Sequence, residues 1–264
     1  MNCNCNSGWL VRSVAIFAIG LLLGCGEEQA AKSPEKQPAL PKLGKKIEFD
    51  QILDQKKLAN PPTFVEVSKA LGVSFKYFND AREKRYFFPE ILGGGFACLD
   101  YDLDGWPDMY CSNGRSLPLD LTDTEHFDCL LRNKKGTELQ DVSQLAAVRE
   151  NGFAHGCAFG DLNADGFDDL AIACFGSISI LYNQGDGTFS RIASENFVYE
   201  PTWSVCPVIS DLNQDGIADL LVVNYVKWNY EVPACTYDNI RGYCGPGEFD
   251  GLTDYLFLNQ GDGR

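Results

Sequence analysis

The chain has 264 residues, of which 45% are hydrophobic, and it carries a formal net charge of −15 at pH 7. This hydrophobic content is too high for a wholly disordered protein, and the length suits one large domain or two small ones. The negative charge argues against a nucleic-acid partner, because little positive charge is available to neutralise phosphates.

The first 24 residues have the pattern of an export signal. Arg12 precedes an apolar stretch over residues 13–24, which is too short to span a bilayer as a helix. Cys25 follows directly, as in bacterial lipoprotein signals. We therefore expect residues 1–24 to be a lipoprotein signal peptide, Cys25 to carry lipid, and the protein to be exported and anchored in the cell envelope, facing the periplasm or the cell surface. The alternative is an ordinary secretory signal followed by a chance cysteine.

Residues 25–61 are rich in Glu, Lys, Gln, Ala and Pro, and their only aromatic residue is Phe49. Such a composition cannot bury enough apolar surface to offset the entropy of folding. We expect a flexible tether here, followed by a folded region over residues 62–264.

The folded region repeats one pattern: short apolar runs bounded by turns, with an acidic loop after the first run of each unit. Such runs are typical of strands, and four antiparallel strands per unit form a propeller blade. The sequence thus predicts an all-β fold, a partial β-propeller of about three four-stranded blades. The expected strands are 93–99, 109–111, 129–133 and 137–142; then 156–160, 170–174, 178–183 and 188–192; then 205–210, 220–223 and 255–259.

The two ends of the repeated region do not contain complete units. Thr63–Val67 resembles a fourth strand but has no acidic loop before it, and the third unit stops before its own fourth strand. Three blades are fewer than the four to eight of closed propellers. We therefore expect an N-terminal fragment of a longer protein; the alternative is a three-blade arc completed by a partner chain.

The acidic loops share the pattern D-x-[DN]-x-D-G-x-x-D, at residues 100–108, 161–169 and 211–219. Side-chain oxygens at positions 1, 3, 5 and 9 and the backbone carbonyl at position 7 can converge on one hard cation, which suits Ca²⁺ better than Mg²⁺. Glycine at position 6 permits a sharp turn where a side chain would obstruct. Position 12 is not Glu, so the loops are not EF-hands. Turn chemistry alone is the alternative, but three copies in one register favour metal binding.

We expect about three Ca²⁺ ions with a mainly structural role. The expected ligands are Asp100, Asp102, Asp104, Trp106 and Asp108; Asp161, Asn163, Asp165, Phe167 and Asp169; and Asp211, Asn213, Asp215, Ile217 and Asp219.

Two stretches, 159–170 and 181–189, resemble the FG-GAP (VCBS-type) repeat of integrin α-subunit propellers. Residues 89–104 and 243–263 resemble bacterial ASPIC/UnbV-type proteins, which are similar to cartilage acidic protein. The resemblance implies a seven-bladed ring, Ca²⁺ in the hairpin loops, secretion, extracellular recognition or adhesion, and no catalytic residues. Asn163 and Asn213 stand where the first loop has an aspartate, so those two sites would be one charge weaker.

Because we expect the protein to be exported, its cysteines after Cys25 would lie in an oxidising compartment, where disulfides form. Cys235 and Cys244 bracket an excursion in the third unit, and we expect them to form a disulfide. Relative to the first aspartate of their loops, the pairs Cys98–Cys111 and Cys157–Cys174 both have positions that sum to +9. A shared hairpin register would place each pair face to face as a further disulfide candidate. The alternative is that these residues are small apolar core residues.

No catalytic motif is present, and His126 and His155 lack a partner at ligand spacing. Trp203, Trp228 and Tyr230, with Tyr237, form either a stacking surface for sugar or ordinary packing. We expect a non-enzymatic protein that contacts an extracellular protein or polysaccharide. The alternatives are a lyase-like, polysaccharide-active enzyme on a calcium-bearing propeller and a purely structural envelope protein.

Overall fold

The computed structural model describes residues 63–120, 122–192 and 203–261. The chain divides into two units, Met1–Thr63 and Phe64–Arg264, and the description below concerns the second unit. The expected signal peptide, Cys25 and the tether lie outside the described residues. Within the described part, no helix is long and apolar enough to cross a membrane.

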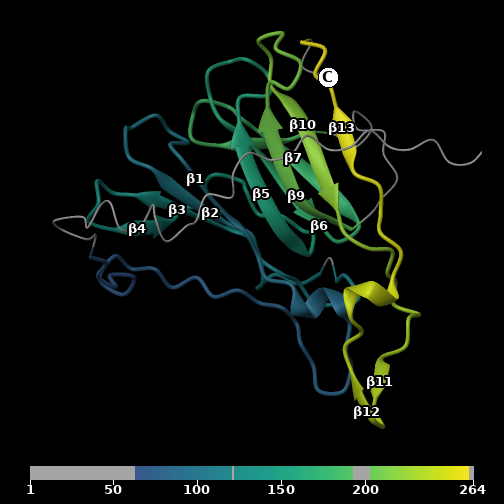
Figure 1. Ribbon diagram of the computed structural model, residues 1–264. Helices are drawn as coiled ribbons and strands as arrows, with labels where there is room; N and C mark the ends of the chain where they lie inside the picture. The colour runs from purple at the N-terminus through teal and green to yellow at the C-terminus, as the bar shows by residue number, and fades with distance from the viewer. Residues whose placement is uncertain (1–62, 121, 193–202, 262–264) are drawn as a thin grey trace, which may run out of the picture. The chain divides into compact units, whose positions relative to one another are not determined.

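The fold is all-β, as the sequence predicts, and its first two units are four-stranded antiparallel sheets (Figure 1). In each sheet the strands follow chain order, so strands that are consecutive in the chain pair with each other; the longest connection within these two sheets is residues 112–128, between β2 and β3. The first sheet contains β1 (Phe96–Leu99), β2 (Asp108–Cys111), β3 (Cys129–Asn133) and β4 (Leu139–Asp141); the second contains β5 (Ala154–Gly160), β6 (Asp169–Cys174), β7 (Ser177–Asn183) and β8 (Phe189–Arg191).

The third sheet has three strands among the described residues, in the order β13 (Tyr255–Phe257), β10 (Asp219–Asn224) and β9 (Ser204–Ser210). Between β10 and β13 the chain makes a separate hairpin of β11 (Cys235–Tyr237) and β12 (Ile240–Gly242). Two short 3-10 helices, η1 (Phe88–Ile91) and η3 (Pro246–Glu248), complete the secondary structure of the described residues.

The core lies between successive sheets. β6 is buried along its whole length because both of its faces are covered. Leu170 and Ile172 pack with Leu99 and Tyr110 of the first sheet, whereas Ala171 packs with residues of the third sheet. This arrangement explains why β6 is continuously apolar from Leu170 to Cys174 instead of alternating.

The first strands of the three units lie next to one another, with β5 between β1 and β9. Glycine makes this close approach possible at one point: a Cβ on Gly156 would lie 2.2 Å from the carbonyl oxygen of Val205. The sheets are therefore packed backbone to backbone along their first strands, an arrangement consistent with propeller blades. The described residues do not form a closed ring.

Thr63–Val67, expected as a fourth strand, is not a strand. Phe64 and Val65 are 93% and 79% exposed, so the segment lacks the packing that would hold it in a sheet. The chain turns instead, and the carbonyl of Leu71 accepts a hydrogen bond from Leu139 at the outer edge of the first sheet.

The four aromatic residues considered for sugar stacking divide between core and surface. Trp203 and Trp228 are buried in an aromatic cluster with Phe88 of η1, and Tyr230 packs against that cluster. The packing interpretation is therefore correct for these three. Tyr237 is half exposed on β11.

Candidate functional site

The three acidic loops have one backbone conformation. Position 4 has a positive φ of 53° to 62° at Leu103, Ala164 and Gln214, and position 6 has a φ of 85° to 92° at its glycines. A Cβ at Gly105, Gly166 or Gly216 would meet no atom within 4 Å. The expectation that a side chain would obstruct this position is therefore wrong: glycine is favoured here by its backbone angle and not by space.

The aspartate at position 1 stabilises this turn by accepting two backbone N–H groups. In the first loop, Asp100 accepts hydrogen bonds from Asp104 at 3.0 Å and Gly105 at 2.8 Å. Asp161 and Asp211 bind the corresponding amides of their loops at 2.8 to 3.1 Å. These bonds leave carboxylate lone pairs free for a cation.

The aspartate at position 9 begins the second strand of each sheet and is buried. Its carboxylate accepts one N–H from loop position 2 and one from the asparagine that ends the third run; in the second unit these donors are Leu162 and Asn183. Burial raises the pKa of Asp108 and Asp169 to about 6, although the two backbone hydrogen bonds oppose the shift. A nearby cation would offset this cost of burying the charged form.

The first loop brings its acidic groups closest together. One oxygen each of Asp100, Asp102 and Asp108 lies within 4.8 Å of the others, the sole such group of three acidic, histidine or cysteine side chains within the described residues. Asp102 Oδ1 is buried and has no hydrogen-bond partner among the described residues. A set of hard oxygen donors with an unsatisfied buried member fits Ca²⁺ in its chemistry.

The second and third loops are arranged differently at position 3. The side-chain amides of Asn163 and Asn213 donate to Oδ2 of Asp165 and Asp215 at 2.8 Å. Position 7 is occupied by Trp106, Phe167 and Ile217, and Trp106 is 40% exposed. The structure thus gathers positions 1, 3 and 9 in the first loop, and it ties positions 3 and 5 to each other in the other two.

Sequence reasoning missed a set of asparagines that connects the sheets. Asn183 donates to the carbonyl of Tyr101 in the first acidic loop at 2.8 Å, and Asn259 donates to Leu162 in the second at 2.6 Å. The first and second loops are therefore each held by the unit that follows. The signal in the sequence was the recurring Asn at the end of the third run, which no rule of strand propensity explains.

Arg132 was missed as well. Its Nη2 lies 2.5 Å from Asp102 Oδ2 and 3.3 Å from Asp104 Oδ2, so a side chain from β3 contacts two of the predicted metal ligands.

The structure contains a disulfide between Cys235 and Cys244, which closes the β11–β12 hairpin. The other two candidate pairs are free thiols. Cys98 lies opposite Met109, and Cys157 lies opposite Ile172. The register expected for these pairs is wrong by two residues, because the hairpin pairs the residue before position 1 with position 9. Cys111 and Cys174 are buried, as the alternative predicted, whereas Cys98 is exposed and Cys157 is only partly buried.

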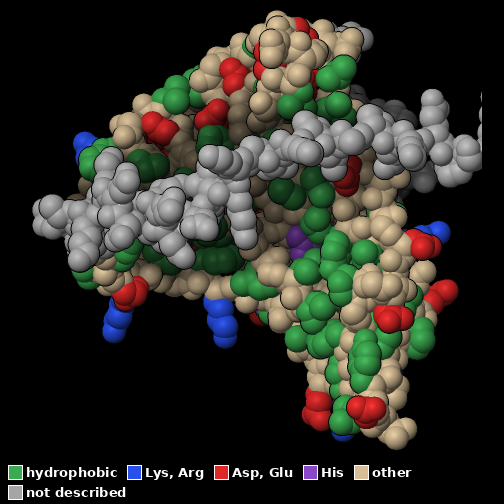
Figure 2. Space-filling model, in the orientation of Figure 1, with side chains coloured by type: hydrophobic (Ala, Val, Ile, Leu, Met, Phe, Trp, Pro, Cys, Tyr) green, Lys and Arg blue, Asp and Glu red, His purple; other side chains and the backbone are tan. Residues whose placement is uncertain are grey.

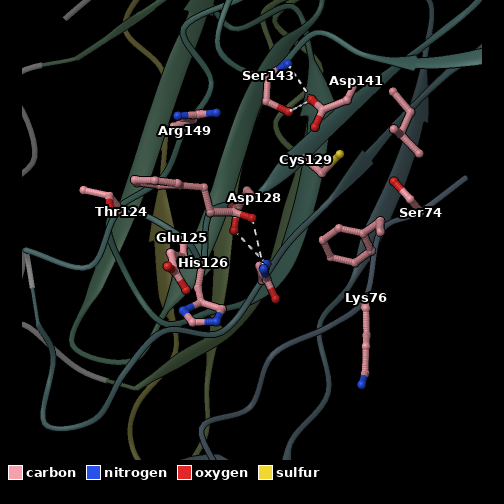
Figure 3. A pocket seen from close by; sticks show the side chains of 14 residues that line it. Ser74, Lys76, Thr124, Glu125, His126, Asp128, Cys129, Asp141, Ser143 and Arg149 are labelled. Carbon is pink, nitrogen blue, oxygen red and sulfur yellow. Dashed lines mark hydrogen bonds between the residues drawn. The ribbon is translucent and has the colours of Figure 1, made fainter.

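A polar pocket of about 270 Å³ lies beside the first sheet (Figure 3). Lys76, His126, Asp128 and Arg149 are among the residues that line it. Asp128 is fully buried, accepts hydrogen bonds from Tyr110 and Asn113 at 2.6 Å, and has a pKa raised by burial to about 8. Its carboxyl is committed to these partners.

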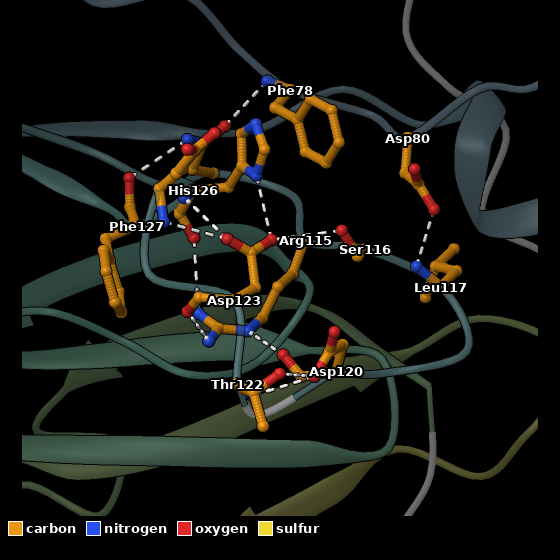
Figure 4. A network of polar contacts seen from close by, with 12 residues as sticks. Phe78, Asp80, Arg115, Ser116, Leu117, Asp120, Thr122, Asp123, His126 and Phe127 are labelled. Atoms are coloured by element: carbon orange, nitrogen blue, oxygen red, sulfur yellow. Dashed lines mark hydrogen bonds and ion pairs between the residues drawn. The ribbon is translucent and has the colours of Figure 1, made fainter.

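A network of polar contacts fixes the loop that carries His126 (Figure 4). The fully buried Arg115 donates to backbone carbonyls of that loop, including Asp120 and His126. His126 Nδ1 lies 2.8 Å from Asp123 Oδ2, and its ring stacks on Phe78 at 3.5 Å. The imidazole is therefore held in one orientation at the pocket.

On the face shown in Figure 2, acidic side chains are spread widely, and the lysine and arginine side chains in view project from its edges. The described residues on this face thus form no basic patch, in keeping with the formal net charge of −15.

These features define an all-β protein built from antiparallel sheets of propeller-blade type, each of the three carrying an acidic hairpin loop. A family model described as an FG-GAP-like repeat matches the chain over residues 100–172 and 161–222. The chain therefore contains FG-GAP-like repeats, and the matched residues include all three acidic loops. No curated protein matches the chain.

Proposed function

We propose that the protein is an exported, lipid-anchored, Ca²⁺-binding repeat protein of the ASPIC/UnbV type that serves recognition or adhesion outside the cytoplasm. The observation that carries cation binding is the convergence of Asp100, Asp102 and Asp108 in a loop whose backbone recurs twice. Bound Ca²⁺ would neutralise the clustered carboxylates and stabilise each hairpin, so its role is structural.

Export is supported by the Cys235–Cys244 disulfide, because stable disulfides are typical of oxidising compartments. Lipidation at Cys25 is tested by labelling growing cells with a radioactive fatty acid. We expect the wild type to be labelled and Cys25→Ala to be unlabelled. Label retained by the variant would contradict the anchor.

Cation binding is tested by counting ions with native mass spectrometry and by melting the protein in Ca²⁺ and in chelator. We expect about three ions, and two after Asp161 and Asp165 are both replaced by Ala. Ligand linkage predicts a melting temperature that rises with Ca²⁺ concentration. The matched control replaces Asp186 and Glu138, two acidic residues outside the loops, and should keep the wild-type count.

An unchanged melt in chelator together with a count of zero would contradict the proposal. A count that stays at three in the Asp161 and Asp165 variant would contradict the ligand assignment alone.

Recognition is tested with the full chain on a glycan array and in pull-downs from extracellular fractions. A saturable ligand whose binding is lost in chelator supports the proposal. The absence of detectable binding in both assays favours a purely structural envelope protein.

A second candidate function is a lyase-like, polysaccharide-active enzyme. It is favoured by the pocket in which His126, oriented by Asp123, lies near Lys76 and Arg149, because a base beside cations could remove a proton next to a carboxylate. Formation of an unsaturated, ultraviolet-absorbing sugar by the wild type but not by His126→Gln would support it. No product with any polysaccharide tested would exclude this role for the pocket.

A further inference from the structure

A positively charged side chain from a neighbouring strand already contacts the first acidic loop. Arg132 extends from β3 so that its guanidinium contacts Asp102 at 2.5 Å and Asp104 at 3.3 Å. About a third of the arginine side chain is exposed, whereas that of Asp102 is 14% exposed. A charge-assisted pair that is partly shielded from water is stronger than a fully exposed one.

The repeats allow the corresponding residues of the other units to be identified without ambiguity. The backbone N–H groups of Asn133, Asn183 and Asn259 bind the position-9 aspartates of their own units at 2.6, 2.8 and 2.9 Å. The residue before each asparagine is therefore equivalent in the three units. These residues are Arg132, Tyr182 and Leu258, so the arginine is particular to the first unit among the three described.

The arginine accompanies a second difference at position 3. In the second and third loops, an asparagine amide donates to Oδ2 of the position-5 aspartate. In the first loop position 3 is Asp102, which cannot donate when ionised, and Arg132 supplies the donor to Oδ2 of Asp104 instead. Asp102 with Arg132 thus replaces one neutral asparagine. The first loop has one more aspartate at its ligand positions than each of the other two loops, and the positive charge of Arg132 offsets that extra negative charge.

We propose that Arg132 is a resident counter-cation of the first loop, which Ca²⁺ must displace in order to bind. The first loop, although it has the most carboxylates at ligand positions, is then the weakest of the three cation sites. This inference rests on the proposed cation binding by the loops and adds an order of filling to it.

The geometry supports displacement more than permanent blockage. Arg132 Nε and Asp102 Oδ1 are both buried without a hydrogen-bond partner within the described residues, so the pair leaves polar groups unsatisfied. Because the arginine is partly exposed, its guanidinium can move into solvent when a cation binds. A cation then satisfies Asp102 Oδ1, which the arginine does not.

The chain provides its own reporter for this loop. Trp106 occupies position 7 of the first loop, where the second and third loops have Phe167 and Ile217. Terbium(III) binds hard oxygen sites and emits when a nearby indole is excited. Light at 295 nm excites tryptophan and not phenylalanine, so emission lost in Trp106→Phe comes from the first loop.

The test titrates terbium into the full-length wild type, Arg132→Leu and Arg132→Lys. Leucine is the residue that the third repeat has at this position, and lysine keeps the charge. We expect Arg132→Leu to lower the half-saturating terbium concentration by about fivefold or more, the ratio expected when an ion pair of moderate strength no longer competes. Arg132→Lys should lie closer to the wild type. An equal half-saturation in wild type and Arg132→Leu would overturn the proposal.

The reciprocal variant is Leu258→Arg with Asn213→Asp, which gives the third loop the pair found in the first. Native mass spectrometry at limiting Ca²⁺ should show one ion fewer than in the wild type. An unchanged count would contradict the proposed competition.

A measurement in chelator examines the same pair without any cation. Arg132→Leu should melt below the wild type because Asp102 loses its counter-charge, and Arg132→Leu with Asp102→Asn should recover most of that loss. Failure of this rescue would overturn the compensation of Asp102 by Arg132.

Failure of the inference about Arg132 can be distinguished from failure of the proposed cation binding. If the wild type and Arg132→Leu both lack Trp106-sensitised emission while mass spectrometry counts ions at the other two loops, this inference fails and the proposed cation binding stands. If no ion is counted at any loop, cation binding itself fails.

Discussion

The first and second sheets have the same strand order and the same loop, but they differ in what surrounds them. The second sheet lies between two others, and β6 is buried on both faces. Within the part of the chain that the structure describes, the first sheet has a neighbouring sheet on one face only, and its other face is covered by Val73 and Phe75 from the preceding segment. Equivalent residues of the two sheets therefore differ in burial. The repeated sequence determines the backbone conformation of each sheet, whereas the number of neighbouring sheets determines how its faces are packed.

The two sheets also differ in buried charge. The register places Ile178 of the second sheet at the position that Asp128 holds in the first. The apolar residue packs towards the third sheet, whereas the buried acid binds Tyr110 and Asn113. The first sheet thus depends on polar contacts where the second depends on apolar burial.

The largest difference between the sheets should follow from removing the first apolar residue of the second strand. Leu170 is fully buried and Met109, its equivalent, is partly exposed. We expect Leu170→Ala to lower the free energy of unfolding by about 3 kcal/mol and Met109→Ala by about 1 kcal/mol, because cavity cost grows with burial. Urea unfolding of both variants measures the difference. Equal losses would mean that the outer face of the first sheet is packed as tightly as the inner one.

The next effect concerns Asp128, whose pKa is raised from 3.8 to about 8 by burial. The folded state keeps a proton that the unfolded state releases, so this group lowers stability as pH rises between about 4 and about 8. Asparagine can keep both hydrogen bonds and cannot titrate. From pH 5.0 to pH 6.5 we therefore expect the wild type to lose up to about 2 kcal/mol relative to Asp128→Asn.

Urea unfolding of the wild type and Asp128→Asn at the two pH values provides the test, and other titrating groups cancel in the difference. Ile178→Val in the second sheet is the control and should show no such pH dependence. A difference that does not change with pH would mean that Asp128 is ionised in the folded state.

The smallest effect should come from the asparagines. Asn183 binds Tyr101 across the sheets, whereas Asn133 binds Pro107 and Gly136 within its own unit. We expect Asn183→Ala to cost about 1 kcal/mol more in unfolding free energy than Asn133→Ala, the contribution of one buried hydrogen bond. Should the two variants prove equally stable, the bond between the sheets would add nothing to their cohesion.

The strands could be predicted because their signals are local. Apolar runs between turn residues place β2, β3 and β6 within a residue or two of their observed bounds. Thr63–Val67 has the same local signal and is not a strand, because an edge strand also needs a partner. Propensity could not indicate whether one is present.

The acidic loops could be predicted as turns with clustered oxygens, because the spacing of Asp100 to Asp108 fixes which groups share one turn. The cysteine register could not. It depends on which backbone groups pair around the loop, and the observed pairing of Leu99 with Asp108 moves each cysteine two residues away from its expected partner.

The repeat, the all-β class and the position of three acidic loops between paired strands follow from the amino-acid sequence alone, because hydrophobic periodicity and turn chemistry act over a few residues. The contact of Arg132 with Asp102 and the hydrogen bond by which Asn183 holds the first loop arise only when the chain packs in three dimensions. These contacts join residues 30 and 82 positions apart, and their formation depends on how strands and sheets pack, which no local pattern specifies.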